Sequence, residues 1–221
     1  MAAFRILVAD DHEVVRKGLI DILKQKPEWQ VCGEAADGRE AIELAKQLMP
    51  DVIVMDISMP RLNGLEATRH LMKENPATKV LVLTFHDSDQ VIRSVLDAGA
   101  RGFLLKSDSA CELVAAVDAL LGNKTYFTSK VAAMVLEGYL RGGSPFAADP
   151  SPLTARERQV VQLLAEGSST KEVAVSLGLS SKTAETHRSN IMRKLQIHCV
   201  SDLVLYAVRN NIVQIMQAGV E

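Results

Sequence analysis

Residues 4–11, FRILVADD, place two aspartates directly after a short apolar run. Three later runs of the same kind also end in a polar residue, namely VIVMD at 52–56, VLVLT at 80–84 and GFLLK at 102–106. Short runs without alternation, separated by helical stretches, are typical of strands buried on both faces of a parallel sheet. The carboxyl ends of such strands share one edge, where ligands bind. The sequence therefore predicts one crevice that holds the side chains of Asp10, Asp11, Asp56, Thr84 and Lys106.

Helical periodicity between these runs completes an alternating order. A further strand is expected around 30–33, and helices are expected at 14–23, 41–48, 64–74, 89–98 and 109–121. The prediction is thus five strands and five helices in strict βα order. This order predicts an α/β domain built on a doubly wound parallel sheet with right-handed crossovers.

Beyond the last of these helices the strand pattern ends. Residues 128–140 are expected to form one helix, and the Gly, Pro and Ser density of residues 141–152 is typical of a flexible linker. Only helical patterns follow. We therefore divide the chain into an α/β domain at 1–122, a linker helix with a flexible linker at 123–150, and an all-α domain at 151–221.

Length and charge also favour two domains. A chain of 221 residues is long enough to bury two cores. Residues 1–125 carry 15 Lys and Arg against 19 Asp and Glu, whereas residues 151–221 carry 8 against 6. The first part is thus acidic and the last part mildly basic. So small a positive surplus is only weak evidence for nucleic acid.

The cysteines and the apolar segments bear on the compartment. Cys32, Cys111 and Cys199 are odd in number, widely spaced and fit neither a disulfide framework nor a zinc pattern, so we expect reduced thiols. The first residues show no signal-peptide pattern, and no segment approaches the length of a membrane span. We expect a soluble, cytoplasmic protein without a membrane partner.

The residues of the predicted crevice suit phosphoryl chemistry. A carboxylate attacks a phosphoryl group only when its repulsion with the phosphate oxygens is cancelled, so a divalent cation and a lysine belong beside it. Asp10, Asp11 and Asp56 would supply hard oxygen ligands suited to Mg²⁺. Taken alone, Asp11, Thr84 and Lys106 each have a structural explanation as a helix cap or a solvated side chain. Their joint placement at four strand ends favours a site.

The motifs of this first part resemble the receiver domain of bacterial two-component response regulators. They are the pair Asp10-Asp11, the segment VMDISMP at 54–60 with Gly64, and the single residues Thr84 and Lys106. The resemblance covers roughly residues 4–122 and implies a flavodoxin-like five-stranded sheet. It also implies that a histidine kinase phosphorylates Asp56, and that Asp11, Asp56 and the Ser58 backbone carbonyl bind Mg²⁺, with Asp10 in support.

The same resemblance assigns a switch to this domain. Thr84 and Lys106 are the groups that would bind the phosphoryl oxygens, and Phe103 matches the aromatic residue that pairs with Thr84. An aspartyl phosphate adds negative charge and acceptor oxygens, which would draw Thr84 inward and make room for Phe103. The face built by the fourth helix and the fifth strand is then expected to change.

Residues 169–195 have the pattern of a helix, a tight turn and a second helix. Gly178 fits the left-handed residue that closes a helix, and Ser180 or Ser181 can cap the next one. The outer face of the second helix is polar and rich in donors, as a helix in the DNA major groove must be. An unrelated helical bundle would also show polar outer faces, so the pattern alone does not decide.

A longer string resembles the LuxR-type DNA-binding domain over about residues 151–215. It comprises LTARER at 153–158, KEVA at 171–174 and SKTAETHRSNIMRKL at 181–195. With the receiver, this combination resembles the NarL/FixJ class, whose DNA-binding domain has four helices. The resemblance makes Lys182, Glu185, Thr186 and Ser189 candidates for reading bases. It makes Thr183, Arg188, Asn190, Arg193 and Lys194 candidates for phosphate contacts or support.

Apolar residues recur at helical spacing near the end of the chain, at Leu203, Val204, Ala207, Val208 and Ile212. Part of this stripe must pack on its own domain. The resemblance implies that the exposed part, sought among the first four of these residues, pairs with a second subunit. A two-fold dimer would read an inverted repeat in double-stranded DNA.

The two resemblances together imply a phosphorylation-dependent transcriptional regulator. Phosphorylation of Asp56 by a sensor histidine kinase would control dimerisation and promoter binding, and RNA polymerase would be a further partner. Before phosphorylation the receiver is expected to cover the recognition helix. No catalysis is expected beyond slow loss of the protein's own phosphoryl group.

Two other functions stay open at this point. A hydrolase with Asp56 as its nucleophile would need a substrate-binding cap and a second acid, and the sequence shows neither. A DNA-binding protein that ignores phosphorylation would have no use for the intact acidic set.

Overall fold

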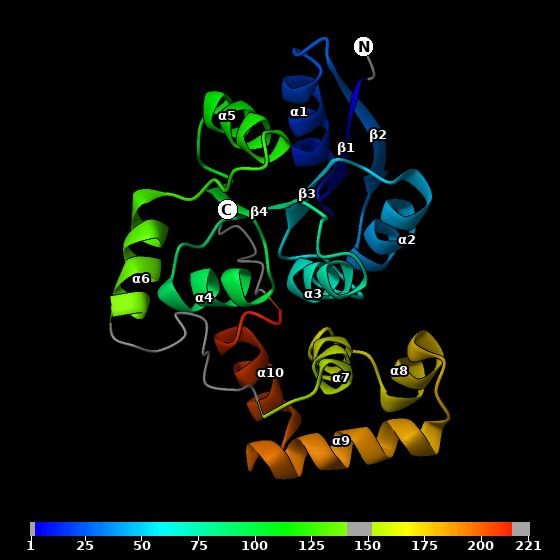
Figure 1. Cartoon of the computed structure of the whole chain (residues 1–221). Helices are drawn as coiled ribbons and strands as arrows, with labels where there is room; N and C mark the ends of the chain where they lie inside the picture. The colour runs from blue at the N-terminus through cyan, green and yellow to red at the C-terminus, as the bar shows by residue number, and fades with distance from the viewer. Residues whose placement is uncertain (1–2, 141–151, 214–221) are drawn as a thin grey trace, which may run out of the picture. The chain divides into compact units, whose positions relative to one another are not determined.

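The computed structural model describes residues 3–140 and 152–213. The chain separates into two compact units, residues 1–149 and 150–221, both drawn in Figure 1. Most of the flexible linker expected near residue 145 and both chain ends lie outside the described residues.

The described part of the first unit forms one five-stranded parallel sheet in the order β2-β1-β3-β4-β5. The strands are β1 Phe4–Ala9, β2 Trp29–Ala35, β3 Val52–Asp56, β4 Val80–Thr84 and β5 Gly102–Leu105. This is the strand order of the flavodoxin-like doubly wound fold, so the predicted fold class is confirmed. The order reverses between β1 and β3, and ligands of such sheets bind at the carboxyl ends beside that point.

Five helices cover the two faces of the sheet. They are α1 Glu13–Leu23, α2 Gly38–Leu48, α3 Gly64–Glu74, α4 Asp89–Asp97 and α5 Ala110–Leu121. Helices α1 and α5 pack on one face and α2, α3 and α4 on the other (Figure 1). Ile6 and Val8 of β1 point to the first face, whereas Leu7 and Ala9 point to the second. Both faces are buried, which explains why the strand runs are apolar without alternation.

A sixth helix, α6 Ser129–Leu140, also belongs to the first unit. Val131 is fully buried in the core that α2, α3 and α4 cover, and Tyr126 forms a bridge with Gly102 of β5. The Lys130 Nζ donates hydrogen bonds to the backbone oxygen of Asp87 at 2.6 Å and to its Oδ2 at 3.1 Å. The start of the expected linker helix is therefore part of the α/β core.

The described part of the second unit consists of four helices. They are α7 Ala155–Ala165, α8 Thr170–Leu177, α9 Ser181–Leu195 and α10 Val200–Arg209. Capping boxes begin α7 and α8, at Thr154 with Glu157 and at Ser169 with Glu172. Gly178 takes the left-handed conformation that closes α8, with φ at 63°. These caps set the α8–turn–α9 geometry that the sequence predicted.

A hydrophobic cluster forms the core of this unit, and Glu157 and Gln162 of α7 are also buried. Val173 of α8, Ile191 of α9 and Leu203 of α10 are all buried within it. Among the described residues of both units, none of the helices is both long enough and apolar enough to cross a membrane.

Candidate functional site

The carboxyl edge of the sheet gathers charged groups from three strand ends. Asp10 follows β1, Asp56 ends β3 and Lys106 follows β5. The Lys106 Nζ lies 2.7 Å from Asp10 Oδ2 and 3.0 Å from Asp56 Oδ2. The side chains of Lys106, Asp10 and Asp56 are only 3%, 0% and 2% exposed. Groups from distant parts of the chain thus form one buried ionic cluster, as their positions after the strands predicted.

The cluster carries more negative than positive charge. Within the described structure, Lys106 is the cation that contacts the carboxylates of Asp10 and Asp56, and Asp11 lies beside them. Burial raises the pKa of Asp56 to about 6; Lys106 acts in the opposite direction, and the Asp10 and Asp11 carboxylates add to the increase. Surplus negative charge around a buried carboxyl is an arrangement that a bound cation stabilises.

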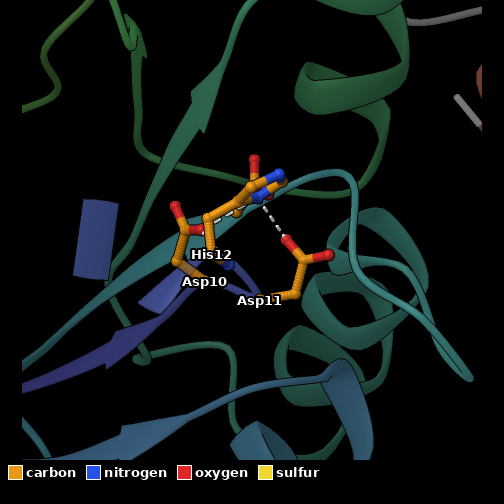
Figure 2. Close-up of side chains that lie close together, drawn as sticks. Asp10, Asp11 and His12 are labelled. Carbon is orange, nitrogen blue, oxygen red and sulfur yellow. Dashed lines mark hydrogen bonds and ion pairs between the residues drawn. The ribbon is translucent and has the colours of Figure 1, made fainter. Parts of the chain in front are cut away.

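Asp11 and His12 complete the acidic side of the pocket (Figure 2). The His12 Nδ1 lies 2.7 Å from Asp11 Oδ1 and 3.5 Å from Asp10 Oδ1. The backbone N–H of His12 donates to Asp10 Oδ1 at 2.9 Å. Ligand atoms from Asp10, Asp11, His12 and Asp56 all lie within 4.8 Å of one another. The group is compact enough to surround one ion.

Three oxygens of this pocket, Asp10 Oδ2, Asp11 Oδ1 and Asp56 Oδ2, are buried and accept no hydrogen bond from the described residues. The Lys106 Nζ forms ion pairs with Asp10 Oδ2 and Asp56 Oδ2, and these offset part of their charge. Converging carboxylate oxygens of this kind are the donors that hard divalent cations take. The pocket therefore fits a divalent cation, while the Ser58 carbonyl as a further ligand stays a prediction.

Close packing at Gly64 fixes the backbone around Asp56. A Cβ at this position would lie 1.9 Å from the backbone oxygen of Asp56, a distance that no side chain could occupy. The N–H of Gly64 donates to the backbone oxygen of Ile57 at 2.9 Å, and Asn63 caps α3 through the N–H of Glu66. The glycine of the sequence motif thus lets α3 begin directly against the end of β3.

The end of β4 contributes a hydroxyl and an exposed aromatic ring. Thr84 is 1% exposed, and its Oγ1 accepts a hydrogen bond from the backbone N–H of His86 at 3.1 Å. Phe85 is 59% exposed, and the Lys106 Nζ lies 5.0 Å from the centroid of its ring. Phe103 is buried, at 1% exposed, within the core under α4. The aromatic ring already occupies an inward position.

A second polar surface lies along α9. Within the described structure, Lys182, Glu185, Thr186, Ser189 and Arg193 are exposed. A shallow groove of about 620 Å³ beside them is lined by Glu185, Arg188, Ser189, Met192, Ile197 and His198. Ala184 and Ile191 are buried on the opposite face, so α9 presents the polar face that the sequence predicted.

Several polar groups of α9 are engaged in the fold. Lys194 donates to Glu157 Oε2 at 2.7 Å, and Glu157 is buried. Burial raises the pKa of the Glu157 carboxyl, but hydrogen bonds from Lys194 and Thr154 more than offset this and hold it below its ordinary value. Arg188 donates to Thr170 Oγ1 at 3.4 Å. Lys194 is therefore a support for α9, which agrees with its place in the second group of candidates.

Comparison with known families decides the identity of both units. Residues 6–118 match the response regulator receiver domain, and residues 151–207 match the bacterial regulatory proteins of the luxR family. The chain belongs to the two-component response regulators with a LuxR-type DNA-binding domain.

Full-length relatives agree with this assignment. The response regulator is 40% identical over 209 residues to the transcriptional regulatory protein LiaR of Bacillus subtilis, covering 95% of this chain and 99% of the relative. It is 35% identical over 210 residues to the response regulator protein VraR of Staphylococcus aureus, with 95% and 99% covered.

One solved structure matches nearly the whole chain and another matches about two thirds of it. RcsB from Salmonella enterica serovar Typhimurium, bound to promoter rprA with the phosphomimetic BeF₃⁻, gives a TM-score of 0.59 at 27% identity, covering 92% of this response regulator and 98% of that chain. A LuxR-family response regulator from Aurantimonas gives a TM-score of 0.58 at 34% identity, covering 63% and 99%.

One part of the predicted dimer surface needs correction. Leu203 and Ala207 are 1% and 0% exposed, because they pack into the core of their own unit. Their side chains are unavailable to a second subunit. Val204 and Val208 are half-buried, and Leu205 is 51% exposed. Of the four predicted dimer residues, only Val204 and Val208 therefore stay available to a second subunit, and Leu205 and Val200, which is 44% exposed, add apolar surface on α10.

Two residues beside the pocket were not singled out from the sequence of the response regulator. His12 follows the aspartate pair directly and Phe85 follows Thr84 directly, so adjacency to a predicted site residue was the available signal. Only the fold shows that the His12 imidazole turns back to the carboxylates and that the Phe85 ring lies near Lys106.

Proposed function

We propose that this response regulator accepts a phosphoryl group on Asp56 from a cytoplasmic sensor histidine kinase, and that the modification controls promoter binding through α9. The observation that carries the proposal is the buried cluster in which one lysine contacts the carboxylates of Asp10 and Asp56. A carboxylate held at the carboxyl edge of a parallel sheet, beside a cation and a hydroxyl, is arranged to accept a phosphoryl group.

The transfer itself is a displacement at phosphorus. A carboxylate oxygen of Asp56 attacks the phosphorus of a phosphohistidine, and an O–P bond forms as the N–P bond breaks. The electron pair of the broken bond stays on the imidazole nitrogen, which then takes a proton from solvent. The raised pKa of Asp56 makes its carboxylate a stronger base than an exposed aspartate, while most of it is still ionised at neutral pH.

The neighbouring groups would stabilise the negative charge of the phosphoryl group once it is attached to Asp56. Lys106, 3.0 Å from Asp56 Oδ2, is placed to pair with a phosphoryl oxygen once that oxygen is attached. Asp10, Asp11 and Asp56, with the Ser58 carbonyl, would hold Mg²⁺. Bound there, Mg²⁺ would neutralise the phosphoryl oxygens. Burial of the cluster keeps water away from the resulting acyl phosphate.

Thr84 connects the pocket to the loop that follows β4. Its hydroxyl now accepts a hydrogen bond from His86, and this bond is lost if Thr84 turns to bind a phosphoryl oxygen. The next residue, Asp87, holds Lys130 of α6 by its backbone oxygen and its carboxylate. Phosphorylation would thus loosen the loop that anchors α6, the helix that leads toward the second unit.

The α9 surface is the proposed contact with double-stranded DNA. Lys182, Glu185, Thr186 and Ser189 would face base edges, with Thr183, Arg188, Asn190 and Arg193 nearer the phosphates. Two copies joined through the exposed part of α10 would read an inverted repeat and position RNA polymerase. The relative RcsB has been solved with promoter DNA in the presence of a phosphomimetic, which supports this reading.

We propose no turnover of other substrates, so loss of the aspartyl phosphate by slow hydrolysis is the only reaction expected after transfer. Steady phosphate release from phosphorylated metabolites, measured with the wild-type chain and with Asp56→Asn, would contradict this.

Intact-mass analysis after incubation with acetyl phosphate and Mg²⁺ tests the phosphoacceptor. The wild-type chain should gain one phosphoryl group and Asp56→Asn should gain none. Asp51→Asn is the matched control, because Asp51 is an exposed aspartate just before β3 that accepts from the backbone N–H of Arg5. Equal gain by wild type and Asp56→Asn would overturn the assignment.

A further inference from the structure

The imidazole of His12 lies where a metal ligand would lie. His12 occupies the N-cap position of α1 without a capping hydrogen bond from its side chain, which turns back toward the carboxylates (Figure 2). The ring is 43% exposed, so only one side of it faces the pocket. Its backbone N–H is held by Asp10 Oδ1 at 2.9 Å, which fixes the residue against the site.

The spacing of the His12 and Asp11 atoms suits two neighbouring ligands of one ion. His12 Nδ1 lies 2.7 Å from Asp11 Oδ1 and 3.5 Å from Asp10 Oδ1. Two adjacent ligands of an octahedral ion, each about 2.1 Å from the metal, lie about 3 Å apart. The two measured separations bracket that value.

The same short separation could arise from a hydrogen bond between the ring N–H and Asp11. Asp11 Oδ1 is, however, a buried carboxylate oxygen that accepts no hydrogen bond from the described residues, although His12 Nδ1 is its close neighbour. A cation held between these two atoms would stabilise that oxygen.

We propose that His12 Nδ1 is an additional ligand in this pocket, and that it gives the site a preference for a first-row transition ion over Mg²⁺. The inference rests on the metal-assisted phosphoryl site proposed above. Imidazole nitrogen is a poor ligand for Mg²⁺ and a good one for transition ions, of which Mn²⁺ also accepts carboxylate oxygens readily. A set of three carboxylates and one imidazole matches Mn²⁺.

Pulsed electron paramagnetic resonance of Mn²⁺ bound to the full chain tests this directly, because it detects a coordinated nitrogen. The wild-type spectrum should contain modulation from one ¹⁴N nucleus. His12→Asn should lose it, whereas His70→Asn should keep it. His70 is the matched control, since it lies on α3 and pairs with Glu74 at 3.1 Å. Competition should show a Mn²⁺ to Mg²⁺ affinity ratio that falls about tenfold in His12→Asn.

Two results would overturn the inference: no ¹⁴N modulation in the wild-type chain, or modulation that survives in His12→Asn. Circular dichroism of each variant keeps loss of fold apart from loss of the ligand. The outcome is also separate from that of the proposed function. Wild-type uptake of a phosphoryl group with Mg²⁺ but without nitrogen coupling would remove only the role of His12, whereas nitrogen coupling without uptake on Asp56 would remove only the phosphoacceptor.

Discussion

The pocket at the sheet edge and the outer face of α9 are both built from charged side chains, yet they are held in opposite ways. Asp10, Asp56 and Lys106 are almost fully buried and contact one another. Lys182 and Glu185 of α9 are exposed. Buried charges depend strongly on their partners, whereas exposed charges contribute little to stability and stay available to a ligand. The first region should therefore respond to substitution as a unit, and the second residue by residue.

Lys106→Met is expected to have the largest effect on stability of the substitutions considered. It leaves the buried carboxylates of Asp10 and Asp56 without their cation, so the variant should lose about 3–5 kcal/mol of unfolding free energy at pH 7.5. Urea denaturation followed by the fluorescence of Trp29 measures this, because Trp29 is the only tryptophan and lies in β2 of the first unit. The loss should shrink below pH 6 as the carboxyls take up protons. A loss under about 1 kcal/mol at pH 7.5 is typical of exposed ion pairs. Such a result would contradict the dependence of the buried carboxylates on Lys106.

Asp56→Asn should change stability in the opposite direction. The pKa of Asp56 rises from 3.8 to about 6 on folding, so the folded state holds the proton more tightly than the unfolded state. This favours the folded state at low pH and destabilises the wild type above pH 6, by about 3 kcal/mol. The variant should be more stable than wild type at pH 7.5, by an advantage that falls between pH 6 and pH 4. An advantage that does not depend on pH would exclude the charge as its cause.

Gly64→Ala tests the packing that positions the pocket. Its Cβ would collide with the backbone oxygen of Asp56, so unfolding free energy should fall by about 1–3 kcal/mol and phosphoryl uptake should slow. Gly18→Ala is the matched control, because the described structure leaves the space around a Cβ on this α1 residue open. That control should gain up to about 1 kcal/mol. Equal effects of the two substitutions would contradict the close contact of α3 with β3.

The two lysines at opposite ends of α9 should separate support from DNA contact. Lys194→Met loses the hydrogen bond to the buried Glu157, so it should lower thermal stability by about 1 kcal/mol. Lys182→Met should leave stability unchanged and weaken DNA binding, with a salt dependence reduced by about one counterion. Thermal unfolding and salt-dependent fluorescence anisotropy measure the two effects. A stability loss in Lys182→Met would mean that the α9 face is part of the fold.

The sheet and its acidic edge followed from the sequence because the signals were local. Four of the five strand runs are apolar and end in a functional residue, and a parallel sheet brings such ends together whatever the intervening helices do. The second strand spans Trp29–Ala35 and is longer than the 30–33 that the sequence pattern predicts. It is an edge strand, and its Gln30 and Glu34 side chains are exposed. These polar residues interrupt the apolar pattern near both ends of the strand, so hydrophobicity alone does not locate the ends.

What the sequence could not supply were contacts set by tertiary packing. The apolar stripe of α10 was visible, but not that Leu203 and Ala207 are used by the domain core. The helix after residue 128 was expected, but not that Val131 would complete the core beneath α4. The bridging position of Lys106 between two carboxylates depends on side-chain directions that no periodicity encodes.

The most direct test of the whole account is the affinity for DNA before and after phosphorylation. Fluorescence anisotropy would use a duplex selected from a random pool by the acetyl-phosphate-treated chain, at one fixed salt concentration. The account predicts that treatment tightens binding of the wild-type chain at least tenfold and leaves Asp56→Asn unchanged. Equal affinities of treated and untreated wild type, with phosphorylation verified by intact mass, would contradict it.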